Sequence, residues 1–305
     1  MNSIHLAIGS TVSRPGDLDG NLAQITTFAR QAADDGVNVL LTPEMSASGY
    51  GGFPEVLATA EIAGQGRIYA ALADIARETG VVLCAGFVEA RGELRHLAHY
   101  VVYPDGHFVV QRKHRVTAAE APLDPIKPLL PVAGDDLGQP ESLEFIIFEI
   151  CGVRCAISIC ADAGIRDLNA YLAAQGVEVL FGPTGAGGRR EDRVTTAELR
   201  SEEGREHYLQ IFETLFSPGR GVLDCLAYGR ALAAVNMCGY DGQRHYHAGH
   251  GMIISPMGEV VGFFHGQPNL DRQRPMYAHG VVDVADRLWA PDAAGRYLAA
   301  APPAG

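Results

Sequence analysis

The sequence predicts an α/β protein with mixed sheets, and three observations support this class. Apolar runs of strand length alternate with amphipathic stretches of helix length, which is typical of βα units. Hairpins interrupt the alternation, so the sheets should contain antiparallel as well as parallel neighbours. A hydrophobic content of 47% in 305 residues is ample for a buried core. Two mixed sheets that each keep one uncovered apolar side would therefore stack face to face, with helices on their other faces.

The first half of the chain supplies two predicted βα units, a further strand and a hairpin. The first helix is expected because its apolar residues share one helical face and Gly36 follows as a stop signal. The hairpin is expected because Asp105-Gly106 separates two alternating runs. The expected elements are a strand at 4–9, a helix at 17–36, a strand at 37–44, a helix at 66–80, a strand at 81–87 and a hairpin at 97–114.

The second half continues with hairpins, helices and buried strands. The expected elements are a hairpin at 142–160 turning at Gly152, a helix at 166–176, a strand at 177–183, helices at 196–216 and 220–229, a strand at 231–236 and a hairpin at 249–264 around Pro256-Met257-Gly258. No linker divides these elements. The sequence thus predicts one domain over residues 1–290 and a loosely ordered or partner-docked tail over residues 291–305.

Charge and composition exclude several classes of partner. Lys and Arg number 24 against 36 Asp and Glu, so the formal net charge is 24 − 36 = −12. Such a surface repels phosphate backbones and anionic lipids, and we expect no nucleic-acid or membrane partner. The N-terminal stretch has no basic region and no long apolar core, and no 18 uncharged apolar residues run together. These features predict a soluble cytoplasmic protein.

The six cysteines do not suggest a disulfide framework in a chain of this length. All except Cys160 stand in apolar contexts that favour small buried side chains, namely Cys84, Cys151, Cys155, Cys225 and Cys238. A zinc site at the Cys151-x3-Cys155 pair is disfavoured, because the intervening residues suit a hairpin turn and no second pair lies at ligand spacing.

Three polar residues lie at the ends of predicted strands, and α/β proteins bind their ligands at such strand ends. Glu44 ends 37–44, Lys113 ends "GHFVVQRK", and Cys160 ends "RCAISIC". Each alone is a weak signal, since such residues are commonly caps, solvated charges or buried thiols. Together they form a chemical set: a carboxylate can take the thiol proton, and a lysine can stabilise the negative charge that develops. Such a set attacks a carbonyl or nitrile carbon and passes through a thioester or thioimidate, with no metal required.

The chain resembles the nitrilase, or carbon–nitrogen hydrolase, superfamily in four segments. "LTPEMSASGY" is similar to the family segment around the catalytic glutamate, "QRKH" to its lysine segment and "ISICAD" to its cysteine segment. "AGHGMIISPMGEVVG" is similar to a stretch near the end of the family fold. The order of the segments agrees, and the resemblance runs from about residue 4 to about residue 284, so the domain at 1–290 would be a carbon–nitrogen hydrolase domain of an amidase or N-carbamoyl amidohydrolase type.

This resemblance implies a fold, a site and an assembly. The fold would be a four-layer α-β-β-α sandwich, and the protein a homodimer or higher homo-oligomer without a cofactor. The implied catalytic triad is Glu44, Lys113 and Cys160. Supporting residues would be Glu120, which positions substrate or the lysine unless it is an exposed loop carboxylate, the backbone N–H of Ala161, and Asp162, which orients the site or caps the following helix. Tyr50 and His250 fall in matching segments and are predicted to contact substrate.

The chain also departs from the family pattern. Arg115 stands where the family often has a histidine after the lysine, and Ile165-Arg166-Asp167 stands where it often has Phe-Pro-Glu. Asp224, Ala227 and Tyr228 replace a common arginine and Glu-Asn pair, and Gly251 replaces a usual serine. These changes leave the triad intact and bear on substrate choice.

Three other segments allow alternative interpretations. The histidines of "RHYHAGH" could bind zinc or copper, but no acid or cysteine lies at ligand spacing, which favours substrate-facing loop residues. The glycine-rich "TGAGGRRED" lacks a nucleotide-binding spacing, which favours a flexible loop over the site. The charged helix at 196–216 has apolar faces and is predicted to shape the pocket rim and an oligomer interface.

Two classes of function remain. The first is a cysteine hydrolase acting on a small-molecule amide, including N-carbamoyl compounds. Within it, a nitrilase is the second choice, because nitrilases often carry a tryptophan where this chain has Ala161. Acyl transfer to an amine needs the same thioester and stays open. The second class is a non-catalytic binding member of the fold, against which the intact Glu, Lys and Cys argue.

Overall fold

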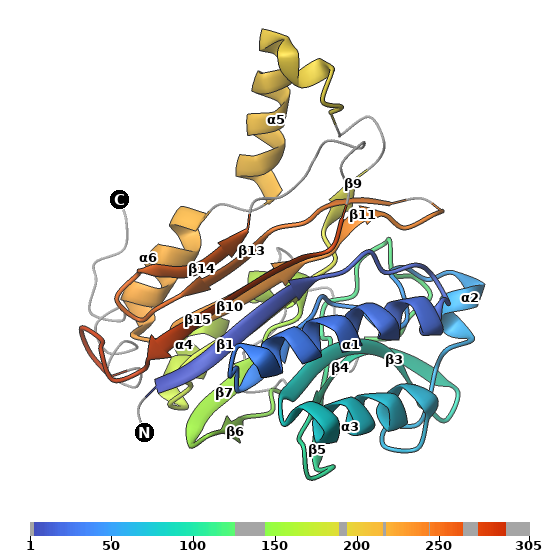
Figure 1. Ribbon diagram of the computed structural model, residues 1–305, viewed down its shortest axis with the longest axis horizontal. Coiled ribbons are helices and arrows are strands. Elements are labelled where there is room, and N and C mark those ends of the chain that lie inside the picture. The colour runs from blue at the N-terminus through green and yellow to red at the C-terminus, as the bar shows by residue number, and fades with distance from the viewer. Residues whose placement is uncertain are drawn as a thin grey trace.

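Two six-stranded sheets pack face to face and carry helices on their outer faces (Figure 1). The computed structural model describes residues 3–125, 144–188, 194–215, 218–243, 245–264 and 274–290. The predicted α/β class and four-layer α-β-β-α order are confirmed. The predicted tail at 291–305 lies outside the described residues, and the single-domain assignment stays a prediction. Within the described residues no helix combines the length and the apolar character that crossing a membrane requires.

The first sheet contains the N-terminal strands and one strand from the end of the fold. Its order is β15 (Met276–Asp283), β1 (Ser3–Ser10), β2 (Val39–Leu41), β3 (Val82–Arg91), β4 (Leu94–Val102) and β5 (Phe108–Arg112). The three strands of the βα units, β1, β2 and β3, are parallel, and the hairpin strands β4 and β5 extend the sheet in antiparallel fashion. The sheet is therefore mixed, as the interrupted alternation predicts.

The second sheet is built in the same manner. Its order is β14 (Val260–Phe264), β13 (Gly251–Ile254), β10 (Ala231–Asn236), β8 (Val179–Thr184), β7 (Val153–Ile157) and β6 (Phe148–Ile150). The central strands β7, β8 and β10 are parallel, and each edge carries an antiparallel hairpin partner. The carboxyl ends of the three parallel strands consequently lie along one edge of the sheet.

The largest hydrophobic cluster lies between the two sheets. It joins residues such as Ile8 and Leu41 of the first sheet to Phe181 and Val235 of the second, all of them fully buried. A second cluster packs α1 (Leu18–Asp34) and α3 (Arg67–Thr79) on the outer face of the first sheet. Smaller clusters pack α4 (Leu168–Ala174) and α6 (Pro218–Tyr228) on the outer face of the second. Each sheet thus has two apolar faces, which explains its nearly continuous hydrophobic strands.

Local chemistry fixes the ends of the helices. The Asp17 side chain caps α1 by accepting the N–H of Gly20 at 3.0 Å. The first turn of α3 begins at a glycine without a capping side chain, and Glu61 supplies the missing acceptor by taking the N–H groups of Ile68 and Tyr69. The short helix α2 (Pro54–Leu57) has proline in its first turn, where its missing N–H costs nothing.

Several elements differ from the sequence prediction. Strand β15 was not predicted, and β2 ends three residues before Glu44. The helix expected at 196–216 is a 3-10 turn, η4 (Glu198–Arg200), followed by α5 (Glu202–Leu215), which stands away from the body of the molecule (Figure 1); residue 216 lies outside the described residues.

A small third sheet also changes two earlier expectations. It joins β9 (Gly187–Gly188), β12 (Tyr246–Ala248) and β11 (Cys238–Tyr240). Part of the predicted flexible loop at 184–192 is therefore paired backbone, while residues 189–192 lie outside the described residues. The histidine-rich segment is likewise not an open loop, because its residues Tyr246–Ala248 form strand β12, which pairs with β11. The expectation of a buried Cys151 is wrong, because this residue lies exposed in the turn between β6 and β7.

Candidate active site

Glu44, Lys113 and Cys160 meet between the ends of the two sheets. Lys113 directly follows β5, and Glu44 and Cys160 each lie three residues beyond their strands, β2 and β7. The backbone N–H of Glu44 donates to the carbonyl of Thr184 at the end of β8, which joins the turn after β2 to the second sheet. The turns that follow strands of both sheets therefore bring the three side chains close together, as the sequence predicts.

Lys113 lies buried between two carboxylates. Its Nζ donates to Glu44 Oε1 at 2.5 Å and to Glu120 Oε1 at 2.6 Å, and all three side chains are fully buried. Glu120 is held in turn by the Tyr50 hydroxyl, which donates to Oε1 at 2.9 Å, and by the backbone N–H of Thr117, which donates to Oε2 at 2.9 Å. The alternative of an exposed loop carboxylate at Glu120 is excluded, and Tyr50 belongs to the same cluster.

Cys160 occupies a strained backbone position at the start of a turn. It opens the 3-10 helix η2 (Cys160–Gly164) with φ of +49°, in the left-handed region that non-glycine residues rarely adopt. Such strain persists only where the surrounding structure enforces it, and it is common at reactive groups. The backbone N–H of Gly185 interacts with the thiol, and Cys160 is partly exposed while its buried partners are not. The N–H of Ala161 lies in the first turn of η2, where N–H groups have no partner within the helix.

The electrostatics of the cluster keep the thiol and the lysine protonated. Burial raises the pKa of Glu44 to about 7, with a further rise from Glu120, while Lys113 and the nearby Cys160 thiol lower it. Burial and the Glu44 carboxylate raise the pKa of Cys160 above its usual value. Burial lowers the pKa of Lys113, but the negative charges of the Glu44 and Glu120 carboxylates outweigh this effect and raise it. The resting site therefore holds a neutral thiol beside a carboxylate that titrates near neutrality.

Asp162 joins the turn that carries Cys160 to the turn that carries Lys113. Its carboxylate accepts the backbone N–H of His114 at 3.1 Å and that of Arg115 at 2.7 Å. The N–H of Glu144 donates to His114 Nε2, so the imidazole proton belongs on Nδ1, which faces Asp162 Oδ2 at 3.5 Å. Asp162 is fully buried, and its contacts go to the two active-site turns; they do not cap a following helix.

Aromatic side chains contact the ring of Tyr50. The rings of His245 and His247 meet Tyr50 edge-on, with centroids 5.4 and 5.3 Å away, and Phe53 lies 6.0 Å from His245. His245 Nδ1 lies 3.0 Å from Asp241 Oδ2, which fixes the orientation of its ring. His250 is buried, and its backbone carbonyl accepts the N–H of Asn236. Its predicted contact with substrate stays a prediction.

Gly185 is a site residue that the sequence reasoning missed. A Cβ atom at this position would lie 2.5 Å from the Tyr50 ring and 2.9 Å from Glu44 Oε2, so only glycine lets the backbone approach both residues. The signal was present in "TGAGG", where the glycines were interpreted as flexibility. This position requires glycine because its backbone packs closely against the Glu44 carboxylate. Its N–H also interacts with the Cys160 thiol.

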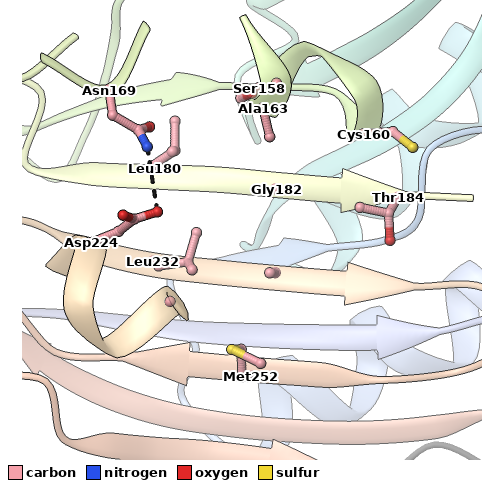
Figure 2. A pocket seen from close by; sticks show the side chains of 13 residues that line it. Ser158, Cys160, Ala163, Asn169, Leu180, Gly182, Thr184, Asp224, Leu232 and Met252 are labelled. Carbon is pink, nitrogen blue, oxygen red and sulfur yellow. Dashed lines mark hydrogen bonds between the residues drawn. The ribbon is translucent and has the colours of Figure 1, made fainter. Parts of the chain in front are cut away.

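A cavity of about 320 Å³ reaches Cys160 along the outer face of the second sheet. Figure 2 shows Cys160 and Thr184 at one end and the hydrogen-bonded pair Asn169 and Asp224 at the other. Oε2 of Glu44 is buried and is not bound by Lys113, which donates to Oε1. The described residues contain no group of three or more His, Cys, Asp or Glu side chains arranged to hold a metal ion. The arrangement of Glu44, Lys113 and Cys160 suits acid–base and nucleophilic chemistry.

Comparison with known proteins assigns the class. The carbon-nitrogen hydrolase family profile matches residues 4–212, and the chain belongs to this family. A curated nitrilase from Pyrococcus abyssi is 25% identical over 167 residues; the match covers 54% of this chain and 58% of that relative's length.

Solved structures of amidases share the fold. A mutant of the amidase from Nesterenkonia sp. AN1 in complex with butyramide superposes with a TM-score of 0.68 at 19% identity, covering 93% of this chain and 94% of that one. A second mutant of that amidase, which shows covalent addition of the acetamide moiety of fluoroacetamide at its active-site cysteine, gives 0.68 at 20% identity and covers 93% and 92%.

Proposed function

We propose that the protein hydrolyses the C–N bond of a small amide or N-carbamoyl compound through a thioester on Cys160. The observation that carries this proposal is the cluster itself: a partly exposed cysteine on a strained turn beside a buried carboxylate that an ammonium group holds in place. Family membership and the amidase folds support the reaction class. The chemical types of all three side chains are those that acyl transfer to a thiol needs.

The first half-reaction forms the acyl-enzyme. Glu44 takes the proton of the Cys160 thiol as the sulfur attacks the carbonyl carbon, because the raised pKa of the thiol leaves little thiolate at rest. Lys113 and the backbone N–H of Ala161 stabilise the oxyanion, and each well-aimed donor contributes about 3 kcal/mol. Glu44 then gives its proton to the departing amine, and the C–N bond breaks.

The second half-reaction releases the acid. Glu44, again ionised, takes a proton from water as the oxygen attacks the thioester, and returns a proton to sulfur when the C–S bond breaks. A pKa near 7 suits both roles, since the carboxyl must lose and regain a proton in each cycle. Glu120 and Tyr50 hold the lysine in place, and Asp162 holds the two turns together.

The test is turnover combined with mass spectrometry. We expect the purified protein to release ammonia from some members of a panel of primary amides and N-carbamoyl amino acids, and a quenched reaction to carry the acyl mass on Cys160. Cys160→Ala should abolish both signals, whereas Cys151→Ala, at an exposed turn, should keep them. Turnover by the Cys160→Ala protein at the wild-type rate would refute the mechanism.

A nitrilase activity is the second candidate, because the curated relative is named a nitrilase. A nitrile would give a thioimidate on the same cysteine, followed by ammonia and the carboxylic acid. Adding nitriles of the same carbon chains to the panel separates the two candidates by their relative kcat/KM. Acyl transfer would appear as a new amide when an amine is present. A cytoplasmic location and a homo-oligomeric assembly remain predictions.

A further inference from the structure

The peptide group that joins Thr184 to Gly185 lies between the base and the nucleophile. Thr184 is the last residue of β8 and lies at the Cys160 end of the cavity (Figure 2). The carbonyl of this peptide accepts the backbone N–H of Glu44 at 3.4 Å, and its N–H interacts with the Cys160 thiol. The carbonyl and the N–H of a trans peptide point in opposite directions. This single peptide group therefore extends from the turn that carries Glu44 to the sulfur.

A backbone N–H directed at the sulfur stabilises a thiolate more than a thiol. A neutral thiol is a weak acceptor, whereas hydrogen bonds to a charged acceptor are about twice as strong as neutral ones. Burial is the main cause of the raised pKa of Cys160, and the N–H of Gly185 acts against it by lowering the pKa. In the proposed mechanism, the sulfur gains negative charge when Glu44 takes its proton and again when the C–S bond breaks. A donor already in place assists both steps.

The segment after this peptide needs an external tether. Residues 185–188 read Gly-Ala-Gly-Gly, glycine has more backbone freedom than any other residue, and the ladder with β12 begins only at Gly187. The side chain of Asn236 supplies the tether, because its Nδ2 donates to the carbonyl of Ala186 at 2.9 Å. His247 Nδ1 makes a longer contact of 3.3 Å with the same carbonyl. A carbonyl can only accept, so the amide of Asn236 must present its nitrogen here.

Asn236 is itself held by both sheets. It ends β10 opposite Thr184 in the parallel ladder, and it is fully buried. Its backbone N–H donates to the carbonyl of His250 at 2.8 Å, and its carbonyl accepts the hydroxyl of Ser10, from the first sheet, at 2.6 Å. Its Oδ1 has no hydrogen-bond partner among the described residues. An unpartnered buried amide oxygen costs free energy that an apolar side chain would avoid, so the bond from Nδ2 to Ala186 accounts for asparagine at this position.

We propose that the N–H of Gly185 is a hydrogen-bond donor to the reacting sulfur in both half-reactions, and that Asn236 is the positioning residue that directs it. This inference rests on the proposed hydrolysis at Cys160. Strand β8 fixes Thr184 on one side of Gly185, and Asn236 fixes Ala186 on the other. The glycine between them is thereby constrained to keep its N–H on the sulfur.

Alkylation of Cys160 by iodoacetamide measures this role apart from catalysis. Only the thiolate reacts, and in Asn236→Ala the thiolate loses its donor. Loss of a hydrogen bond to a charged group lowers the thiolate fraction about tenfold to 100-fold, and the greater nucleophilicity of a more basic thiolate offsets about half of this change on a logarithmic scale. We therefore expect Cys160 to react about threefold to tenfold more slowly at neutral pH, as followed by peptide mass spectrometry.

Two controls accompany this measurement. Cys151, which lies exposed in a turn, is the internal reference and should react equally fast in both proteins. Asn38→Ala removes an asparagine whose Oδ1 accepts the N–H of His5 in the first sheet, and it should leave the Cys160 rate unchanged. An unchanged rate for Cys160 in Asn236→Ala would overturn the inference. A faster rate, which is the result expected of a pocket that merely opens, would overturn it as well.

Asn236→Thr allows the same comparison if the alanine variant does not fold. Threonine is favoured in strands, and its hydroxyl ends one bond short of the position of Nδ2. This variant should slow the alkylation of Cys160 as alanine does. Alkylation at the wild-type rate would show that the tether does not direct the donor.

Turnover separates positioning from a collapsed pocket. On an amide that the wild-type protein hydrolyses, Asn236→Ala should lower kcat by about tenfold with KM retained, because the donor acts on charge that develops at the sulfur. A raised KM with kcat retained would overturn the inference. If the wild-type protein hydrolysed no amide while the alkylation rate still depended on Asn236, the proposed hydrolysis would be refuted and the positioning of the donor upheld.

Discussion

At the residue scale, the chemistry of the site depends on one ammonium group placed between two buried carboxylates. Isolated buried charges are expensive, and Lys113 is tolerated because Glu44 and Glu120 both accept from it within 2.6 Å. Burial raises the pKa of both Glu44 and the Cys160 thiol, and the negative charge of Glu120 raises both further. In the proposed mechanism, the Cys160 thiol is consequently activated during attack and not beforehand.

The pH dependence of kcat/KM should report the ionisation of Glu44. Glu44 must be ionised to take the thiol proton, and its pKa lies at about 7, so kcat/KM should fall tenfold per pH unit well below pH 7. Glu149→Gln, an exposed carboxylate on β6, should leave this profile unchanged. An acidic limb centred near the ordinary carboxyl pKa would show that another group controls the rate.

Lys113→Met should destabilise the protein in a pH-dependent way. Removing one partner of a buried ion pair costs about 3–5 kcal/mol, and here it also removes the interaction that lowers the Glu44 pKa. The folded state then holds its carboxyl protons to higher pH than the unfolded chain does, so the free energy of unfolding falls as pH rises above about 4.5. Urea unfolding at mildly acidic and mildly alkaline pH measures this slope.

Arg30→Met provides the control for that measurement. Arg30 belongs to an exposed pair with Glu78, and its loss should cost less than about 1 kcal/mol at either pH. A Lys113→Met protein as stable as Arg30→Met at alkaline pH would contradict the account of the buried cluster.

At the scale of elements, the turns after β5 and β7 act as one unit through Asp162. The carboxylate spans backbone N–H groups on the lysine turn while its own backbone belongs to the cysteine turn. These hydrogen bonds link two turns that follow strands of different sheets. We therefore propose that Asp162 positions the turn that carries Cys160.

Asp162→Ala should lower kcat by about 100-fold with little change in KM, since a shift of about 1 Å between reacting groups has an effect of that size. Asp162→Asn keeps one acceptor oxygen and should recover part of the loss. The exposed Asp286→Ala serves as the matched control. A parallel rise in KM, with kcat retained, would indicate a substrate contact instead.

Periodicity and turn chemistry predict most elements of this fold, and they fail where long-range pairing decides. The helices α1, α3 and α4 appear where apolar spacing and terminal glycines place them. Strand β15 shows no regular apolar pattern, because Val282 is its one buried side chain, and its ladder with β1 joins residues 266 to 280 positions apart. A single-sequence pattern contains no signal for such a partner.

The sequence likewise predicts those residues of the candidate site that carry a local signal, and it misses those whose role depends on long-range contacts. Glu44, Lys113 and Cys160 were found because a strand end is visible in the sequence and their chemical types fit one reaction. Gly185 was missed, because its importance comes from a close approach to Tyr50 and Glu44 that no local pattern encodes. The role of Asp162 in joining two turns could not be predicted either, since its hydrogen bonds cross about 48 positions of sequence.

At the scale of the whole molecule, we propose that exposed apolar side chains on α5 and α6 contribute to self-association. Leu209 of α5 and Leu223 of α6 are 55% and 67% exposed. A contiguous apolar patch formed by such residues favours contact with a second subunit. The homo-oligomer that the sequence predicts stays a prediction.

We expect sedimentation analysis to show a homodimer or higher oligomer, and Leu223→Glu to shift the distribution toward the monomer. A charge placed in a buried contact is strongly unfavourable. Leu94→Glu alters an equally apolar, exposed residue on the other sheet and should leave the distribution unchanged. A wild-type protein that sediments as a monomer would end this proposal.

The division of the site between two sheets also controls when the chain becomes reactive. The base and the ammonium group come from the first sheet, and the sulfur comes from the second. During synthesis, a chain that has completed only its first 125 residues carries no nucleophile, and later intermediates carry a thiol with no base beside it. We therefore expect turnover to appear only after the two sheets have packed together during folding. The rate at which turnover returns during refolding would then report the rate of this packing step.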